Sequence, residues 1–153
     1  AIRAGHMAQE QESLPPGSSA LEILLGLGGF NETAARQFLS YYLFTGDEVF
    51  TPAASLSYGE RARLNLACLV AQGCNFLLLD EPVNHLDIPS RGRFEQALSR
   101  FEGTILAAAH DRYFIRAFAS EIWQIEDGRL VQGAWLAEPD EDGSVIESGA
   151  WQE

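Results

Sequence analysis

Apolar residues recur every three or four positions over much of the first half of the chain. This is the period of a helix that buries one face. The spacing predicts three helices, each preceded by a residue that suits a helix start. They are Leu21–Leu27 after Ser18 or Ser19, a helix that begins after Asn31, and Ser57–Gln72, which ends at Gly73. We interpret the first two as a small helical subdomain.

The second half contains two continuous apolar runs, Phe76–Leu79 and Thr104–Ala109. Runs without alternation are typical of strands that are buried on both faces of a parallel sheet. A helical segment follows each run, Arg91–Phe101 after the first and Arg112–Ala117 after the second. Strands that alternate with helices predict an α/β fold with a parallel sheet.

A hairpin is predicted near the end of the chain. The dipeptide Asp127-Gly128 separates two strand-like runs, Glu121–Glu126 and Arg129–Gln132. Such a pair readily adopts the left-handed conformations that a two-residue hairpin turn needs. The expected fold class is therefore α/β, with a parallel sheet, a small helical subdomain and a C-terminal hairpin.

Composition limits the kinds of partner. The chain has 153 residues, 46% of them hydrophobic, which suffices for one domain with a sizeable core. Its net charge of −12 argues against binding nucleic acid through a basic surface, because phosphate contacts need Arg or Lys. Residues 134–153 contain acids and no base, so we interpret them as an acidic tail.

Three features carry no proposed chemistry. Residues 1–7 show no structural pattern and end in Gly-His-Met, as the remnant of an expression tag would, so we exclude them from the fold. Cys68 and Cys74 lack nearby Cys or His partners, which favours ordinary burial in a reducing compartment over a metal or redox role. No apolar run approaches the ~20 residues needed to cross a bilayer.

Candidate chemistry gathers where the predicted strands end. Asp80 and Glu81 follow the first apolar run, and His110 follows the second. Ligands of an open parallel sheet bind beyond the carboxyl ends of its strands. We therefore expect these three side chains at one edge of the sheet. The structural alternatives are solvated acids at a strand end and a histidine without a chemical role.

The sequence Leu56-Ser57-Tyr58-Gly59-Glu60 marks the start of the third predicted helix. Ser57 and Glu60 have the spacing of a capping box, a common helix start without functional meaning. The functional alternative is an anion site, because a helix N-terminus with a hydroxyl and a glycine beside it favours negative charge.

Taken in order, LSYGER, NFLLLDEPVNHLD and AAAHDRYF resemble the motifs of the ATP-binding cassette (ABC) ATPases. The NHLD and HDRYF elements resemble the ABC-F branch of that family. The resemblance covers residues 8 to about 133. It implies a partial P-loop NTPase fold of the ABC type, with ATP and Mg²⁺ as cofactors. For the parent protein it implies ATP hydrolysis in a composite site between two cassettes.

The resemblance implies a role for each motif residue. Asp80 and Glu81 match the end of a Walker B strand, where Asp80 would help to hold Mg²⁺ and Glu81 would polarise the attacking water. His110 matches the switch histidine that contacts the γ-phosphate. Ser57 and Gly59 match the ABC signature, which grips the γ-phosphate of ATP bound to the opposite cassette.

Two more motifs complete the set. Asn84-His85-Leu86-Asp87 resembles the D-loop, in which Asp87 would link the paired ATP sites. Ala8-Gln9-Glu10 resembles the Q-loop, where Gln9 would touch the nucleotide and the Mg²⁺ shell. For this short second match, an ordinary polar N-terminus is the alternative.

The chain departs from the family pattern at four positions. Residues that are less usual for the family are Tyr58, Glu60, Val83 and Ala109, in place of Gly, Gln, Thr and Ser. From these changes we infer no loss of function. Pro82, which directly follows Glu81, is expected to keep the backbone of Glu81 extended, because proline disfavours the helical conformation of the preceding residue.

No GxxxxGK[ST] phosphate loop and no lysine occur in this sequence. That loop supplies the N–H groups and the lysine that bind phosphates, so this chain alone is expected to be the inactive second half of a cassette. The family's strand order places the strand of the loop between Thr104–Ala109 and Glu121–Glu126. We therefore expect an exposed sheet edge, and with it self-association or incomplete order.

We divide the chain into residues 1–7 (tag remnant), 8–50 (Q-loop and helical subdomain), 51–133 (catalytic half) and 134–153 (acidic tail). The expected partners are a second cassette, in the same chain or another, and the ribosome through regions outside this sequence. The expected location is the cytoplasm, without insertion into a membrane. Two alternatives stay open: the nucleotide-binding subunit of a membrane transporter, and an inactive interaction module.

Overall fold

A computed structural model describes residues 1–8 and 14–133 of the chain. Contacts divide it into a compact unit, Ala1–Ile115, and a second unit that begins at Arg116. Two sequence predictions lie outside the described residues: the role of Gln9 and the acidic tail at 134–153. Among the residues that are described, no helix combines the length and apolar character needed to span a bilayer.

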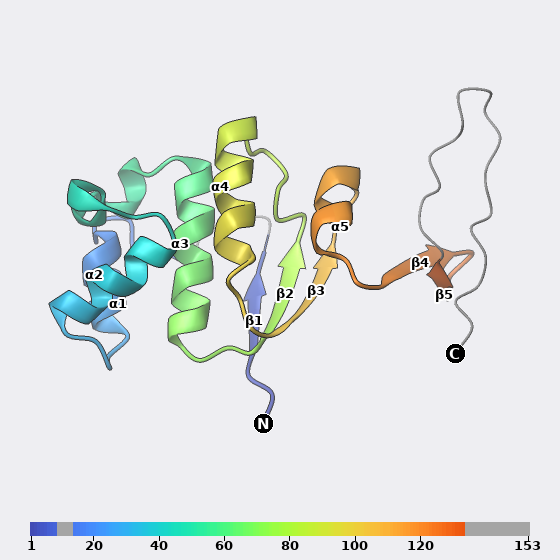
Figure 1. Ribbon diagram of the computed structural model, residues 1–153, viewed down its shortest axis with the longest axis horizontal. Coiled ribbons are helices and arrows are strands. Elements are labelled where there is room, and N and C mark those ends of the chain that lie inside the picture. Colours follow the sequence, from blue (N-terminus) through green and yellow to red (C-terminus); the bar gives the residue numbers. More distant parts are fainter. Residues whose placement is uncertain (9–13, 134–153) are drawn as a thin grey trace. The chain divides into compact units, whose positions relative to one another are not determined.

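The first unit contains a parallel sheet of three strands in the order β1-β2-β3 (Figure 1). The strands are β1 (Ala4–Met7), β2 (Phe76–Asp80) and β3 (Thr104–Ala108). The register places Leu77 of β2 opposite Gly5 of β1 and Ile105 of β3. The predicted α/β architecture with a parallel sheet is confirmed.

Strand β1 corrects the expectation that residues 1–7 lie outside the fold. Met7 is only 4% exposed, and a Cβ added to Gly5 would lie 3.0 Å from Cys74 Sγ. The side chain of Asn75 holds the start of the strand, because its Oδ1 accepts a hydrogen bond from Arg3 N at 2.8 Å. Four residues are too few to show an alternating pattern that would predict a strand. The ending Gly-His-Met also resembles a tag remnant, so the segment was not predicted as a strand.

The α-helices begin within one residue of their predicted starts, with one exception. They are α1 (Ala20–Gly26) after Ser19, α2 (Glu32–Tyr41) after Asn31, α3 (Tyr58–Ala71) after Ser57, α4 (Ile88–Leu98) and α5 (Arg112–Phe118). Two 3₁₀ helices, η1 (Gly46–Phe50) and η2 (Ala53–Ser55), precede α3. Helix α4 is the exception, since it starts at Ile88 rather than Arg91 because Asp87 caps it and Pro89 fits its first turn.

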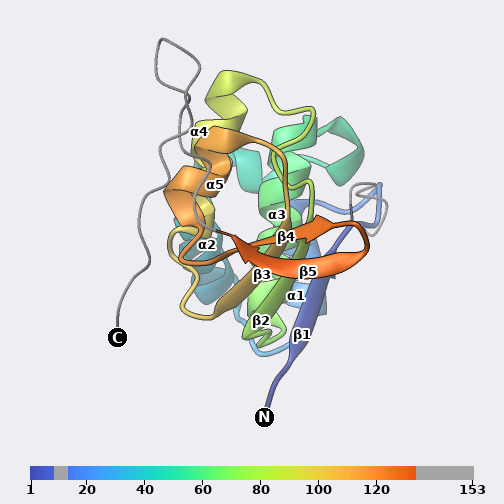
Figure 2. The same cartoon turned by 90° about the vertical axis from the view of Figure 1, so that its right-hand side faces the viewer.

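Helices α3 and α4 lie to one side of the sheet in Figure 1, and α3 lies behind the strands in Figure 2. The large side chains that are fully buried come from both helical and strand segments. They are Leu24, Leu39, Phe44, Val49, Leu64, Leu66, Leu77, Phe94 and Leu98. This core fixes the carboxyl ends of the strands relative to the starts of α3 and α4.

The strands are not buried on both faces, contrary to the prediction from their continuous apolar runs. In β2 the buried residues alternate, with Leu77 and Leu79 covered and Leu78 half-buried. In β3 most positions are exposed, including Leu106 at 46%. Within the described part of the chain, β3 has only β2 as a neighbour in the sheet, so β3 lies at an edge of the sheet.

The second unit contains the predicted hairpin of β4 (Ile122–Glu126) and β5 (Arg129–Gly133). Asp127 and Gly128 both have positive φ, at 48° and 75°. These are the conformations that a tight hairpin turn requires, which is why this dipeptide predicted the turn correctly.

Candidate functional site

The carboxyl end of β2 turns sharply at Glu81. Its N–H donates to Ala108 O of β3 at 2.9 Å, and its carbonyl accepts from Asn84 N at 3.0 Å. The φ of Glu81 is +46°, which corrects the expectation of an extended backbone before Pro82. Proline biases the preceding residue toward the extended region, but the tight turn at the end of β2 holds Glu81 in the left-handed region instead.

The turn brings Glu81 to His110, which follows β3. His110 Nδ1 lies 2.8 Å from Glu81 Oε1, although 29 positions separate the two residues. The side chain of His110 is 77% exposed and that of Glu81 is 25% exposed. The hydrogen bond to Glu81 and its negative charge raise the pKa of His110. The structure therefore places these two side chains at one edge of the sheet, as predicted from the strand ends.

Ser57 and Glu60 form the capping box that their spacing predicts. Ser57 N donates to Glu60 Oε2 at 2.8 Å, and Glu60 N donates to Ser57 Oγ at 3.3 Å. The cap is thus a structural feature at the start of α3. Because the first N–H groups of a helix also carry partial positive charge, the same terminus keeps the physical character of an anion site.

Gly59 has a packing role that the sequence did not reveal. A Cβ at this position would lie 2.6 Å from Ser90 Cβ and 2.9 Å from Ser90 Oγ. Because real Cβ atoms do not approach so closely, the first turns of α3 and α4 can meet only if residue 59 is glycine. The start of α3 is thereby fixed against the residues that follow the predicted D-loop.

The segment from Asn84 to Asp87 joins this packing. His85 has a φ of +64°, and its ring lies edge-on to that of Tyr58, with 6.1 Å between centroids. Asp87 Oδ1 accepts from Ser90 N at 2.8 Å and caps α4, and the hydrogen bonds with Ser90 lower the pKa of Asp87. Tyr58, which departs from the family pattern, therefore touches His85 of the NHLD element, which matches the ABC-F pattern.

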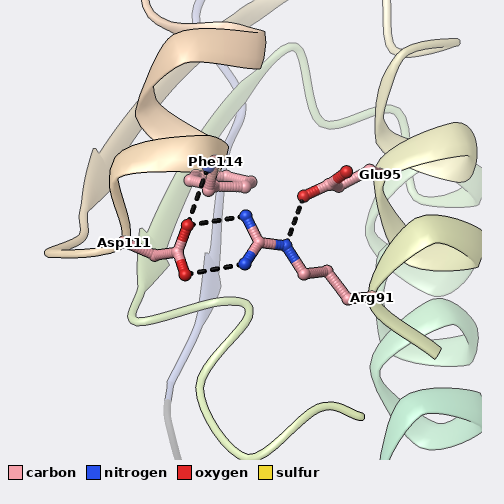
Figure 3. A network of polar contacts seen from close by, with 4 residues as sticks. All are labelled: Arg91, Glu95, Asp111 and Phe114. Carbon is pink, nitrogen blue, oxygen red and sulfur yellow. Dashed lines mark hydrogen bonds and ion pairs between the residues drawn. The ribbon is translucent and has the colours of Figure 1, made fainter. Parts of the chain in front are cut away.

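A polar network that the sequence did not reveal joins α4 to the start of α5 (Figure 3). Arg91 of α4 binds both oxygens of Asp111, with Nη1–Oδ2 at 2.7 Å and Nη2–Oδ1 at 2.6 Å. Arg91 Nε donates to Glu95 Oε1 at 2.8 Å. Asp111 Oδ1 also accepts from Phe114 N at 2.9 Å, so Asp111 caps α5. The available signal was the i,i+4 spacing of Arg91 and Glu95.

The predicted site residues thus form two clusters. Glu81 and His110 meet at the ends of β2 and β3, next to the exposed Asp80. The starts of α3 and α4 carry the other cluster, which contains Ser57, Gly59 and Asp87. Helix α4 belongs to both, because Asp87 caps it and Arg91 reaches the segment that carries His110.

Mg²⁺ fits this site only if few of its ligands come from the protein. No group of three His, Cys, Asp or Glu side chains gathers to hold a metal within residues 1–8 and 14–133. Mg²⁺ commonly binds through one or two carboxylates together with water and phosphate oxygens. The exposed carboxylate of Asp80 at the end of β2 suits that arrangement.

Comparison with known proteins places the chain in a family. The family model described as "ABC transporter" matches residues 3–84, which is more than half of the chain. The putative ATP-binding protein YdiF of Bacillus subtilis is 42% identical over 130 residues, covering 84% of this chain and 20% of YdiF. The energy-dependent translational throttle protein EttA of Mycobacterium tuberculosis is 34% identical over 142 residues, covering 88% of this chain and 25% of EttA.

Two further likenesses agree. ABC transporter F family member 5 of Arabidopsis thaliana is 41% identical over 87 residues, covering 57% of this chain and 13% of that protein. A dimeric structure of the ATP-binding cassette MJ0796, bound to ADP and Pi, superposes with a TM-score of 0.67 at 22% identity, covering 86% of this chain and 63% of that one. This structural likeness shows the fold alone. The chain spans a quarter or less of the length of these curated relatives, and it belongs to the ABC transporter family of ATP-binding cassettes, with ABC-F proteins among its relatives.

Proposed function

We propose that this chain supplies the Walker B, signature, D-loop and switch-histidine elements of a cassette that binds and hydrolyses Mg·ATP in a composite site. The contact of 2.8 Å between Glu81 and His110 carries the proposal. It joins a carboxylate and an imidazole at the edge where an open parallel sheet binds its ligands. The phosphate-binding loop and a second cassette would complete the site.

Each residue has a task in this proposal. Glu81 would accept a proton from the attacking water, and His110 would hold that carboxylate in position through Nδ1 and contact the γ-phosphate. Asp80 and Gln9 would hold Mg²⁺, which, when bound, neutralises charge on the phosphates. Ser57, Gly59 and Asp87 would act on the nucleotide across the interface with the partner cassette. Phosphoryl transfer depends on such positioning and charge stabilisation.

The test is a Glu81→Gln variant of the encoded protein that carries this chain. Glutamine keeps the shape of the side chain but cannot accept the proton, so ATP turnover should fall by roughly 10²–10⁴-fold, while ATP binding is retained. Glu102→Gln removes the same charge from an exposed position between α4 and β3 and should leave turnover unchanged. Equal turnover in wild type and Glu81→Gln would contradict the assignment of the base.

The 153-residue chain alone is expected to show no measurable hydrolysis of Mg·ATP. Ser57 and Gly59 act across an interface in this proposal, so they cannot replace the N–H groups and lysine of a phosphate loop. A phosphate-release assay on the purified chain measures this. Release that disappears in Glu81→Gln would show that the loop is dispensable.

We further propose that the parent protein is a cytoplasmic ABC-F factor that acts on the ribosome. The name of EttA as a translational throttle and the ABC-F relative support this branch, as do NHLD and HDRYF. The net charge of −12 implies that other regions of the protein contact the ribosome. Co-sedimentation with ribosomes that increases with ATP in Glu81→Gln is expected, whereas co-purification with a membrane permease would favour the transporter alternative.

A further inference from the structure

The contact between His110 and Glu81 needs support from elsewhere in the structure. The side chain of His110 is 77% exposed, so packing cannot hold its ring in one rotamer. The residue lies between the last residue of β3, Ala108, and the first residue of α5, Arg112. On the β3 side the backbone is fixed by the hydrogen bond from Glu81 N to Ala108 O.

On the α5 side the backbone is fixed through Asp111. This carboxylate accepts two hydrogen bonds from the guanidinium of Arg91 and a third from Phe114 N. Phe114 is 2% exposed and anchors the first turn of α5. A bidentate pair between arginine and a carboxylate fixes orientation as well as distance. Asp111 is adjacent to His110, so the fork restrains the backbone that carries the histidine.

Arg91 is itself held in a single orientation. Its Nε donates to Glu95 one turn further along α4, and the guanidinium carbon lies 5.8 Å from the centre of the Tyr113 ring. The side chain of Arg91 is 20% exposed, and those of Glu95 and Asp111 are 25% and 31% exposed. Figure 3 shows the guanidinium between the two acids, with its fork directed at Asp111. Partial burial makes such a pair firmer than one on the open surface.

We propose that Arg91 is a positioning residue of the site: by binding Asp111 in a fork, it holds His110 Nδ1 against Glu81. It also connects the switch histidine to α4, whose cap Asp87 belongs to the predicted D-loop. The importance of this role rests on the proposed function of His110. The test of the role is independent of that function, because it measures the hydrogen bond between His110 and Glu81 rather than ATP turnover.

The experiment is ¹⁵N NMR of the histidine rings in this chain, with the His110 signals assigned by loss in His110→Gln. In wild type, neutral His110 should carry its proton on Nδ1, and the pKa should lie above its ordinary value, because Nδ1 donates to the Glu81 carboxylate. In Arg91→Gln the proton should shift toward Nε2 and the pKa of His110 should fall toward its ordinary value.

The direction in which the pKa of His110 changes in Arg91→Gln distinguishes a positioning role of Arg91 from an effect of its charge alone. Removing a cation and leaving Asp111 unpaired would raise the pKa of His110 if Arg91 acted only through its charge. A rise, or no change in the pKa and tautomer, therefore overturns the proposal. Arg93→Gln removes the same charge from an exposed position on the same helix and should leave the tautomer of His110 as in wild type.

If Arg91→Gln does not fold, Arg91→Lys provides a second test of the proposal. Lysine keeps the charge but cannot form a planar fork with a carboxylate. The Nδ1-protonated form should decrease in this variant as well, though less than in Arg91→Gln. If Arg91→Lys matches wild type, the fork is not needed and the proposal is wrong.

Discussion

The two clusters of the candidate site are held in different ways. At the starts of α3 and α4, backbone groups are capped by residues three positions away, and Gly59 allows the two helices to touch. At the ends of β2 and β3, a single hydrogen bond joins two residues that are 29 positions apart, and one partner is largely exposed. The first cluster is a tightly packed junction, whereas the second depends on the position of the surrounding backbone.

This difference indicates where substitutions will act. Changes at the packed junction should alter the stability of the fold, because they introduce clashes or leave N–H groups without partners. Changes at the pair of Glu81 and His110 should alter chemistry and pH dependence with little effect on stability, because an exposed contact contributes little to folding. The following predictions test this division, beginning with the largest expected change in stability.

Gly59→Ala should give the largest loss of stability. The added Cβ would meet Ser90 Cβ at 2.6 Å, and overpacking of this kind costs about 1–3 kcal/mol. Unfolding in urea measures the change. Gly92→Ala on α4 is the matched control, because nothing lies within 4 Å of its added Cβ, and it should stabilise the chain by about 0.5–1 kcal/mol. Destabilisation by both substitutions to the same extent would mean that the close contact of α3 with α4 is incorrect.

Ser57→Ala should lower the free energy of unfolding by a smaller amount, about 1 kcal/mol, because Glu60 N loses the acceptor that caps α3. Ser99→Ala removes a hydroxyl near the other end of α4, where it donates to Gln96 O, and should change the free energy of unfolding by less than about 0.5 kcal/mol. The same urea titration compares the two variants. A loss in Ser99→Ala as large as that in Ser57→Ala would remove the distinction between a helix cap and an ordinary surface serine.

His110→Gln should give the smallest change in stability, and one that depends on pH. The pKa of His110 is raised in the folded chain by Glu81. Its contribution is therefore fully present below the pKa of the unfolded chain and is lost as pH rises through the folded pKa. The difference in unfolding free energy between wild type and His110→Gln should thus shrink from pH 5 to pH 9. A difference that grows over this range has the wrong sign for the contact.

The same contrast explains which features the sequence predicts. Helix caps at Asn31 and Ser57 and the turn at Asp127-Gly128 depend on neighbouring residues, and each was predicted correctly. Ser19, which caps α1, was one of two candidates. Placing Glu81 near His110 needed only the rule that parallel strands end at one edge. The family resemblance then gave both residues a chemical role.

Features that depend on distant packing were not predictable in this way. Strand β1 is defined by its pairing with β2, and its four residues have no pattern of their own. The exposure of β3 depends on what covers the sheet, which the apolar run Thr104–Ala108 cannot report. The fork between Arg91 and Asp111 joins residues 20 positions apart. Each alone is an ordinary charged residue, Arg91 within α4 and Asp111 just before α5.

The most direct test of the account is the pKa of His110 in wild type and in Glu81→Gln, measured by NMR titration. If the two side chains meet where β2 and β3 end, the wild-type pKa should lie above 6.5, the ordinary value, and should return to about that value in Glu81→Gln. The same pKa in both proteins would show that the carboxylate does not contact the imidazole, and the proposed site would have to be abandoned.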